Sequence, residues 1–195
     1  LYNVSNVLAA IAAAHALELP PEAIAHALRH ISPAFGRGES LQIEGRRVHL
    51  LLVKNPAGFT QVARTLAQQP GELHLVVALN DGFADGRDVS WIWDADLTAL
   101  AGRCRLVVVS GRRAEDMALR LRSAGVLPSA SAWLLEKDLA RALRLALART
   151  PEGGELFVLP TYTALLEARA HLARWSGSRP FWKEPMAPAE QERPR

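Results

Sequence analysis

The sequence predicts an α/β protein with an open, mostly parallel, Rossmann-like sheet, helices on both faces and a helical hairpin in front of the sheet. The first observation is that the apolar strands are continuous runs rather than alternating ones, as in residues 105–109. Such runs are typical of parallel strands that are buried on both faces. The second observation is that strand and helix patterns alternate about four times, which favours crossover connections between parallel strands.

The first forty residues have a helical pattern. We expect Asn3 or Ser5 to cap an Ala-rich helix that extends to about Leu17. Pro20-Pro21 should end this helix and start a second one at 22–31, because proline is favoured in the first helical turn. The following stretch, 32–39, is rich in turn formers and is expected to be a loop.

From residue 41 onward, strands and helices alternate, separated by Gly, Pro and Asn. The predicted strands are 41–43, 48–53, 73–79, 105–109, 133–135 and 156–159. The predicted helices are 59–69, 96–101, 114–124, 137–147 and a last one that ends near 175. The first two strands are separated by Glu-Gly-Arg-Arg, which predicts a hairpin. The tail from Ser176 is rich in Pro, Glu and Arg, and we expect it to be mobile.

Composition excludes several classes of protein. The chain has 195 residues, is 49% hydrophobic and carries a net charge of only +3, with no basic stripe that predicts nucleic-acid binding. No apolar run reaches the length of a membrane span, so we expect a cytoplasmic protein. The single cysteine, Cys104, excludes disulfides and four-Cys zinc sites within this chain, and its apolar run predicts a buried thiol. The six histidines lack metal-ligand spacing.

Polar residues follow four of the predicted strands, where open α/β sheets bind their ligands. The four clusters are Lys54-Asn55, Asn80-Asp81, Ser110-Gly111-Arg112 and Thr161-Tyr162-Thr163. In a parallel sheet they converge on one edge, which predicts a site there, although βα loops are polar in any case. Lys54 suits a phosphate or carboxylate as a point charge. The 110–112 cluster opens a helix and suits an anion. The sequence lacks a P-loop and a dinucleotide fingerprint.

The central stretch, 80–96, is a Gly-punctuated loop with five carboxylates and two tryptophans. Asp88 or Asp94 suits the third-member role of a Cys-His-Asp triad, in which a carboxylate orients a histidine. The chain offers no Cys-His pair, so that histidine would belong to another chain. Large aromatic residues in an exposed loop favour packing or binding over a merely solvated loop, and we expect Trp91 to be an interface anchor.

Five blocks of the sequence resemble the MurT family, the Mur-ligase-like subunits of lipid II isoglutaminyl synthase. They are 2–10 (Tyr-Asn-Val-Ser-Asn-Val-Leu-Ala-Ala), 35–39 (Phe-Gly-Arg-Gly-Glu), 53–59 (Val-Lys-Asn-Pro-Ala-Gly-Phe), 84–94 (Ala-Asp-Gly-Arg-Asp-Val-Ser-Trp-Ile-Trp-Asp) and 160–164 (Pro-Thr-Tyr-Thr-Ala). The resemblance covers residues 1 to about 175. The third and fourth blocks are specific, whereas the first is shared by Mur ligases in general.

The resemblance implies an ATP- and Mg²⁺-dependent ligase that works with GatD, a glutaminase that carries the Cys and His. The ligase activates the D-glutamate α-carboxylate of lipid II as an acyl phosphate at the inner face of the membrane. Ammonia from GatD then gives D-isoglutamine. The family's C-terminal domain contributes an Asp to the triad of GatD, and here the matching block offers Asp94, our first choice, and Asp88.

Four further expected binding residues follow from the resemblance. Asn3 and Asn6 are expected near the adenine, and Arg37 and Lys54 near nucleotide or acyl phosphate. Asn55, Asn80 and Asp81 complete the expected nucleotide- and substrate-binding set through their place after the strands.

The chain departs from the family pattern, because the family's P-loop and four-Cys zinc ribbon are not in this sequence. We therefore expect three parts: 1–40 as the end of a central ATPase domain, 41–175 as the C-terminal domain, and 176–195 as a disordered tail. This chain alone is expected neither to hydrolyse ATP nor to amidate. Two alternatives stay open: a non-catalytic docking or regulatory module that binds a glutaminase, and a Mur-type ligase that adds an amino acid.

Overall fold

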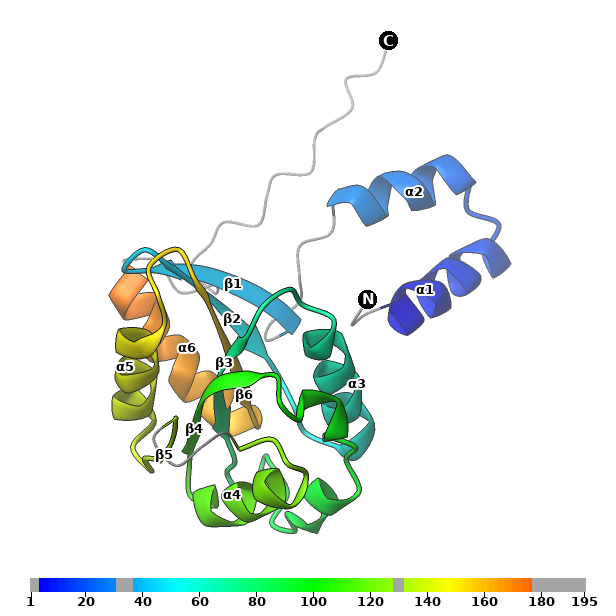
Figure 1. The fold of residues 1–195 in the computed structure, drawn as a ribbon. Helices are drawn as coiled ribbons and strands as arrows, with labels where there is room; N and C mark the ends of the chain where they lie inside the picture. The colour runs from blue at the N-terminus through cyan, green and yellow to red at the C-terminus, as the bar shows by residue number, and fades with distance from the viewer. Residues whose placement is uncertain (1–3, 31–36, 128–131, 177–195) are drawn as a thin grey trace.

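The computed structural model describes residues 4–30, 37–127 and 132–176. Figure 1 shows a twisted sheet with helices on both faces and two further helices at the N-terminal end. The strands are β1 (Arg37–Ile43), β2 (Arg46–Leu51), β3 (Leu73–Ala78), β4 (Cys104–Ser110), β5 (Trp133–Leu135) and β6 (Glu155–Pro160). The helices are α1 (Val4–Ala16), α2 (Pro21–His30), α3 (Pro56–Ala67), α4 (Ala114–Ser123), α5 (Leu139–Arg149) and α6 (Tyr162–Ser176), with 3-10 helices η1 (Ser90–Trp93) and η2 (Thr98–Leu100).

The sheet has the strand order β1-β2-β6-β3-β4-β5. Only β1 is antiparallel to its neighbour; the other four pairs are parallel. The β1–β2 hairpin closes through Glu44 and Gly45, whose φ values of 50° and 76° both lie in the left-handed region, as in a type I′ turn. The predicted open, mostly parallel sheet and its hairpin are confirmed.

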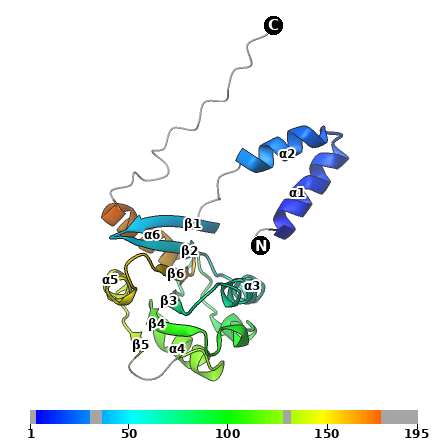
Figure 2. The same ribbon diagram turned by 45° about the horizontal axis from the view of Figure 1, so that its top comes forward.

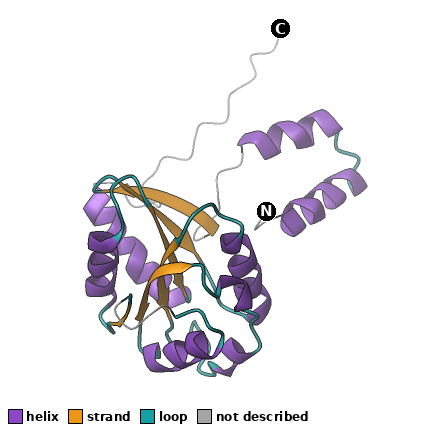
Figure 3. Ribbon diagram, in the orientation of Figure 1, coloured by secondary structure: helices purple, strands orange, loops and turns teal. Residues whose placement is uncertain are grey.

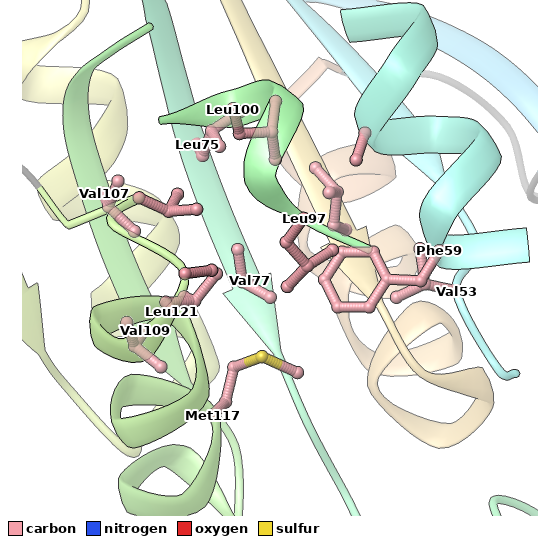
Figure 4. Close-up of a cluster of buried hydrophobic side chains, with 14 of the residues drawn as sticks. Val53, Phe59, Leu75, Val77, Leu97, Leu100, Val107, Val109, Met117 and Leu121 are labelled. Carbon is pink, nitrogen blue, oxygen red and sulfur yellow. The ribbon is translucent and has the colours of Figure 1, made fainter. Parts of the chain in front are cut away.

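The parallel strands β3, β4 and β6 are buried on both faces, and this explains their continuous apolar runs. Leu75 and Val77 of β3 belong to the cluster under α3 and α4, which Figure 4 shows together with Phe59 and Met117. Val76, between them in the sequence, belongs to the second cluster, under α5 and α6. Figure 3 shows helices on both sides of the strands. The core is thus two apolar layers separated by the sheet.

Local signals explain where two of the helices begin. Asn55 caps α3, its side-chain Oδ1 accepting a hydrogen bond of 2.7 Å from the amide of Gly58, and Pro56 occupies the first turn. The prediction placed this start three residues late, at Phe59, because it read Pro56 as part of a loop. Asp138 caps α5 in the same way, accepting from the amide of Arg141 at 2.8 Å.

The helical hairpin formed by α1 and α2 is present, and Figures 1 and 2 both show it apart from the sheet. Ser5 lies inside α1, so its prediction as a cap was wrong, and Asn3 lies outside the described residues. The loop expected at 32–39 was wrong for its last residues, because β1 already begins at Arg37. The predicted tail, except for Ser176, also lies outside the described residues. No helix within 4–30, 37–127 and 132–176 is long and apolar enough to cross a membrane.

Candidate functional site

The chain leaves β3 and β6 toward opposite faces of the sheet. After β3, buried residues of the acidic loop such as Ile92 and Leu97 join the cluster under α3 and α4. After β6, Ala164 and Leu165 of α6 join the cluster on the other face. Because β3 and β6 are neighbours, their carboxyl ends flank a topological switch point, where open α/β sheets bind ligands.

Asn80 connects three strands at this switch point. Its backbone N–H donates to Thr161 Oγ1, and its side-chain Nδ2 donates to Thr163 Oγ1, both at 3.0 Å. Its Oδ1 accepts from the amide of Arg112, also at 3.0 Å. One side chain therefore ties the end of β3 to the segments that follow β6 and β4. The predicted convergence of the polar clusters after these three strands is confirmed.

Asp85 anchors the acidic loop to the same place. Its Oδ1 accepts from the amide of Thr163 at 2.8 Å, and its Oδ2 accepts from Thr163 Oγ1 at 2.6 Å. Oδ2 also accepts from the amide of Gly82 at 3.1 Å. Thr161 and Thr163 belong to the polar cluster that the sequence predicts after β6, although no binding role was assigned to them, whereas Asp85 was not predicted as a site residue. The signal for Asp85 was weaker, because it lies inside the loop rather than beside a strand end.

The backbone of Gly111 packs closely against Leu79 and Asn80. Its φ of +93° lies in the left-handed region, and a Cβ built there would lie 2.5 Å from the carbonyl oxygen of Leu79 and 2.8 Å from Asn80 Oδ1. Only glycine permits this approach. The sequence predicted that residues 110–112 could bind an anion. The backbone amide of Arg112 already donates to Asn80 Oδ1, so this N–H is engaged within the fold.

Asp81 lies in a small charged group beside Asn80. Arg113 Nη1 is 3.3 Å from Asp81 Oδ2, and Arg113 Nε is 2.7 Å from Asp116 Oδ2. The hydrogen bond from Arg113 lowers the pKa of Asp116, so this carboxylate is ionised at neutral pH. Arg113 thus places a positive charge beside both Asp81 and Asp116.

The structure places Lys54 and Asn55 after β2, on the same edge but outside this network. Asn55 Oδ1 is engaged in capping α3, which leaves its Nδ2 group as a donor. Lys54 is exposed and has no ion pair within the described part of the chain. Arg37 opens β1, Asn6 is an exposed residue of α1, and Asn3 lies outside the described residues.

Asp88 and Asp94 flank η1, and both are exposed. Asp88 Oδ1 accepts from the amide of Ser90 at 2.8 Å. This backbone hydrogen bond, followed by one with the Ser90 side chain, lowers the pKa of Asp88. Asp94 follows η1 directly, and its amide donates to the carbonyl of Trp91 at 3.1 Å. The loop thus presents two carboxylates from one short helical turn, and Asp88 is the one held in a fixed orientation.

The two tryptophans of η1 have different surroundings. Trp91 packs against the core with its ring 6.3 Å from that of Phe59 in an edge-on arrangement. Trp93 is 49% exposed, and the guanidinium of Arg120 lies 5.6 Å from its ring centre. Phe83, earlier in the loop, is 95% exposed. The exposed aromatic surface beside the carboxylates is therefore Trp93 and Phe83, not Trp91.

Potential metal ligands and the single thiol are the other side chains that could carry chemistry. Within the described ranges no group of three His, Cys, Asp or Glu side chains is arranged to hold a metal ion. Cys104 is buried, as predicted, and burial raises the pKa of its thiol to about 12. A thiol with this pKa is not a nucleophile at neutral pH, because the thiolate is the reactive form.

Comparison with known proteins identifies the family. The family model described as MurT ligase C-terminal matches residues 52–165. The chain belongs to the MurT family. The MurT subunit of lipid II isoglutaminyl synthase (glutamine-hydrolyzing) from Streptococcus pneumoniae is 34% identical over 174 residues, which are 89% of this chain and 38% of that protein. The chain therefore spans little more than a third of the length of this MurT relative.

Solved structures confirm the Mur-ligase-like fold. A crystal structure of MurF from Acinetobacter baumannii matches with a TM-score of 0.60 at 22% identity, over 87% of this chain and 38% of that one. A bifunctional folylpolyglutamate synthase/dihydrofolate synthase from Yersinia pestis, complexed with AMPPNP and Mn, has a TM-score of 0.54 at 21% identity, over 79% of this chain and 35% of that one. At these identities the likeness concerns the fold alone.

Proposed function

We propose that this chain is the C-terminal part of the synthetase subunit of a glutamine-dependent amidotransferase, which converts the D-glutamate of lipid II to D-isoglutamine. The observation that carries the proposal is the 34% identity over 89% of the chain to a MurT subunit whose name states this synthase and glutamine hydrolysis. We place the reaction at the inner face of the membrane, where lipid II is made available to cytoplasmic enzymes.

The proposed reaction has two chemical steps. The α-carboxylate of D-glutamate attacks the γ-phosphate of ATP, which forms an acyl phosphate and releases ADP. Ammonia then attacks the acyl carbon, inorganic phosphate leaves, and the amide loses a proton. ATP with Mg²⁺ is proposed as co-substrate because ligases of this fold bind nucleotide, and the Yersinia pestis neighbour was crystallised with AMPPNP and Mn. We propose that the P-loop that binds the phosphates lies outside this chain.

The carboxyl edge of the sheet is the proposed contribution of this chain to the first step. Activation of a carboxylate builds negative charge, which cations placed nearby stabilise. Lys54 is exposed at this edge and has no ion pair within the described residues, so its ammonium is available for an acyl phosphate. We assign Asn55, Asn80 and Asp81 to the substrate side of the same edge. Asn3, Asn6 and Arg37 stay proposed for the nucleotide, by family resemblance.

The acidic loop is the proposed contribution to the second step. A GatD-like glutaminase would supply the Cys and His that release ammonia, and an Asp of this chain would orient the His. The geometry favours Asp88 over our first choice, Asp94, because Ser90 already holds the Asp88 carboxylate. A carboxylate that is fixed and ionised loses less conformational entropy when it accepts the imidazole N–H.

Glutamine hydrolysis by the glutaminase, measured with and without this chain, tests the proposal. We expect stimulation by the wild-type chain and a loss of about a hundredfold or more with Asp88→Asn, since a triad that lacks its carboxylate loses orientation of the histidine. Asp94→Asn tests the second candidate. Glu167→Gln, an exposed substitution on α6, is the matched control and should leave the stimulation intact.

Three results would separate the alternatives. Full stimulation by both Asp variants would remove the triad role. Binding without stimulation would favour the non-catalytic docking module. An amino acid that replaces ammonia as the acceptor in the reconstituted ligase, with no glutaminase required, would favour the amino-acid-adding Mur ligase. Isolated, this chain is expected to show no ATP turnover with Mg²⁺, and turnover would contradict its assignment as a part of the ligase.

A further inference from the structure

A cavity of about 500 Å³ lies at the amino edge of the sheet, opposite the edge that carries the candidate site. Its walls come from the beginnings of β3 and β4, from residues that precede β5 and β6, and from the last residue of α5. The volume falls within the range of pockets that bind small molecules. Leu106, Ala132 and Pro151 give it an apolar wall, and the other lining residues are polar or charged.

A β-bulge directs Arg105 into the lining of this cavity. Leu73 of β3 pairs with Cys104 of β4, but the next residue, His74, pairs with Leu106. Arg105 is therefore the extra residue of a bulge in a parallel pair, where bulges are rare. A bulge redirects a side chain, and here it turns a guanidinium to the cavity in a strand whose other residues are all buried.

The cavity carries a surplus of positive charge. Among the described residues, Arg105 has one ion pair, a long contact of 3.9 Å with Glu72, and Glu72 is the one carboxylate of the described lining. Arg149 lies at the end of α5, is exposed and has no ion pair within the described part of the chain. With two guanidinium groups and one carboxylate, the cavity has one net positive charge. Guanidinium groups are suited to bidentate binding of carboxylate and phosphate oxygens.

His74 supplies a neutral polar group to the same cavity. Burial lowers the pKa of this histidine, with Arg105 adding to the shift and Glu72 opposing it. Its imidazole is therefore uncharged at neutral pH and offers one donor and one acceptor. Within the described residues it has no hydrogen-bond partner, so its ring nitrogens are available to a ligand.

We propose that this cavity is a second binding site, for a small organic oxyanion held by Arg105 and Arg149, with its apolar part against Leu106 and Pro151. A phosphate ester and a carboxylate share the chemistry that these groups recognise. The site is separate from the proposed amidation site, since β3 (Leu73–Ala78) runs between them, with His74 near its amino end and Asn80 in the loop after its carboxyl end.

Titration of the whole chain with inorganic phosphate and with butyrate, followed through the imidazole C–H resonances, tests this site. Loss of one signal in His74→Asn assigns the reporter among the six histidines. We expect a saturable shift of the His74 signal and not of His49, which lies elsewhere on the sheet. Tighter binding of phosphate would assign a phosphate ester as the ligand class, and tighter binding of butyrate would assign a carboxylate.

Charge removal shows whether the two arginines hold the anion. Arg149→Gln and Arg105→Gln should each weaken binding about tenfold, because each removes a charge-assisted hydrogen bond. Arg141→Gln, an exposed position two turns earlier on α5 that pairs with Glu136, is the matched control and should bind as the wild type does. The absence of any His74 shift with both probes, or unchanged affinity in both arginine variants, would overturn the proposal.

Discussion

The guanidinium of Arg120 donates from Nε to the backbone carbonyl oxygen of Ile92 over 2.9 Å, although the two residues lie 28 positions apart. The same guanidinium donates to the carbonyl of Ala95 and to Ser123 Oγ, and the ring of Trp93 lies over it. Arg120 is only 8% exposed. A buried arginine of α4 therefore fixes the turn that presents Asp88 and Asp94.

Arg120→Met should destabilise the chain by about 3 kcal/mol. The substitution keeps an unbranched apolar side chain but leaves the carbonyl groups of Ile92 and Ala95 without their donor, at about 1–3 kcal/mol for each buried group. Urea unfolding followed by circular dichroism measures the loss. Arg122→Met, an exposed position on the same helix, is the control and should change stability by less than about 1 kcal/mol. Equal effects of the two substitutions would contradict a structural role for the buried guanidinium.

Trp93→Ala should weaken association with the proposed glutaminase partner by about 2 kcal/mol or more, because an exposed aromatic residue beside the proposed shared site suits a hot spot. Trp91→Ala should instead lower the stability of the fold, since its ring packs against Phe59. Isothermal titration and thermal unfolding of both variants separate the two effects. The association role fails if Trp93→Ala binds as tightly as the wild type.

The sequence was sufficient to predict the sheet because burial on both faces leaves a strong local signal. The runs at β3 and β4 and the proline and cap at the start of α3 are features of single segments. It also predicted that the loops after β3, β4 and β6 meet, which follows from parallel topology alone. The difference between Trp91 and Trp93 was not predictable, because both residues lie in one short 3-10 turn and only the packing of α3 and α4 decides which ring contacts the core.

The hydrogen bonds of the site were beyond sequence reasoning for a related reason. Asp85 and Thr163 are 78 positions apart, and nothing in either segment indicates that one caps the other. The bulge at Arg105 depends on the pairing register of two strands. By contrast, Cys104 was correctly predicted as buried, because an apolar run on a central strand determines its environment.

Cys104 should make the stability of the chain depend on alkaline pH. Burial raises the pKa of its thiol from about 9 in the unfolded chain to about 12 in the folded chain. The protonated thiol is favoured by folding, so this contribution is fully present below pH 9 and is lost as the pH rises from 9 to 12. Urea unfolding at pH 8 and pH 10.5 should show a smaller decrease in Cys104→Ala than in the wild type. An identical decrease in both proteins would assign it to other groups.

Gly111→Ala should disrupt the carboxyl edge of the sheet. The new Cβ would lie 2.5 Å from the carbonyl oxygen of Leu79, which is backbone and cannot move aside, and 2.8 Å from Asn80 Oδ1. The backbone also has a φ of +93°, which L-residues rarely adopt.

Gly86→Ala is the matched control, because its φ is +90° but no atom lies within 4 Å of the new Cβ. We expect about 1 kcal/mol of destabilisation for the control from strain alone, and at least about 2 kcal/mol more for Gly111→Ala, measured by urea unfolding. Amide exchange of Arg112 should rise in the Gly111 variant only, because its hydrogen bond to Asn80 would be displaced. If the two variants lose the same stability, the contact with Leu79 is relieved by backbone movement and Asn80 does not depend on a glycine at this position.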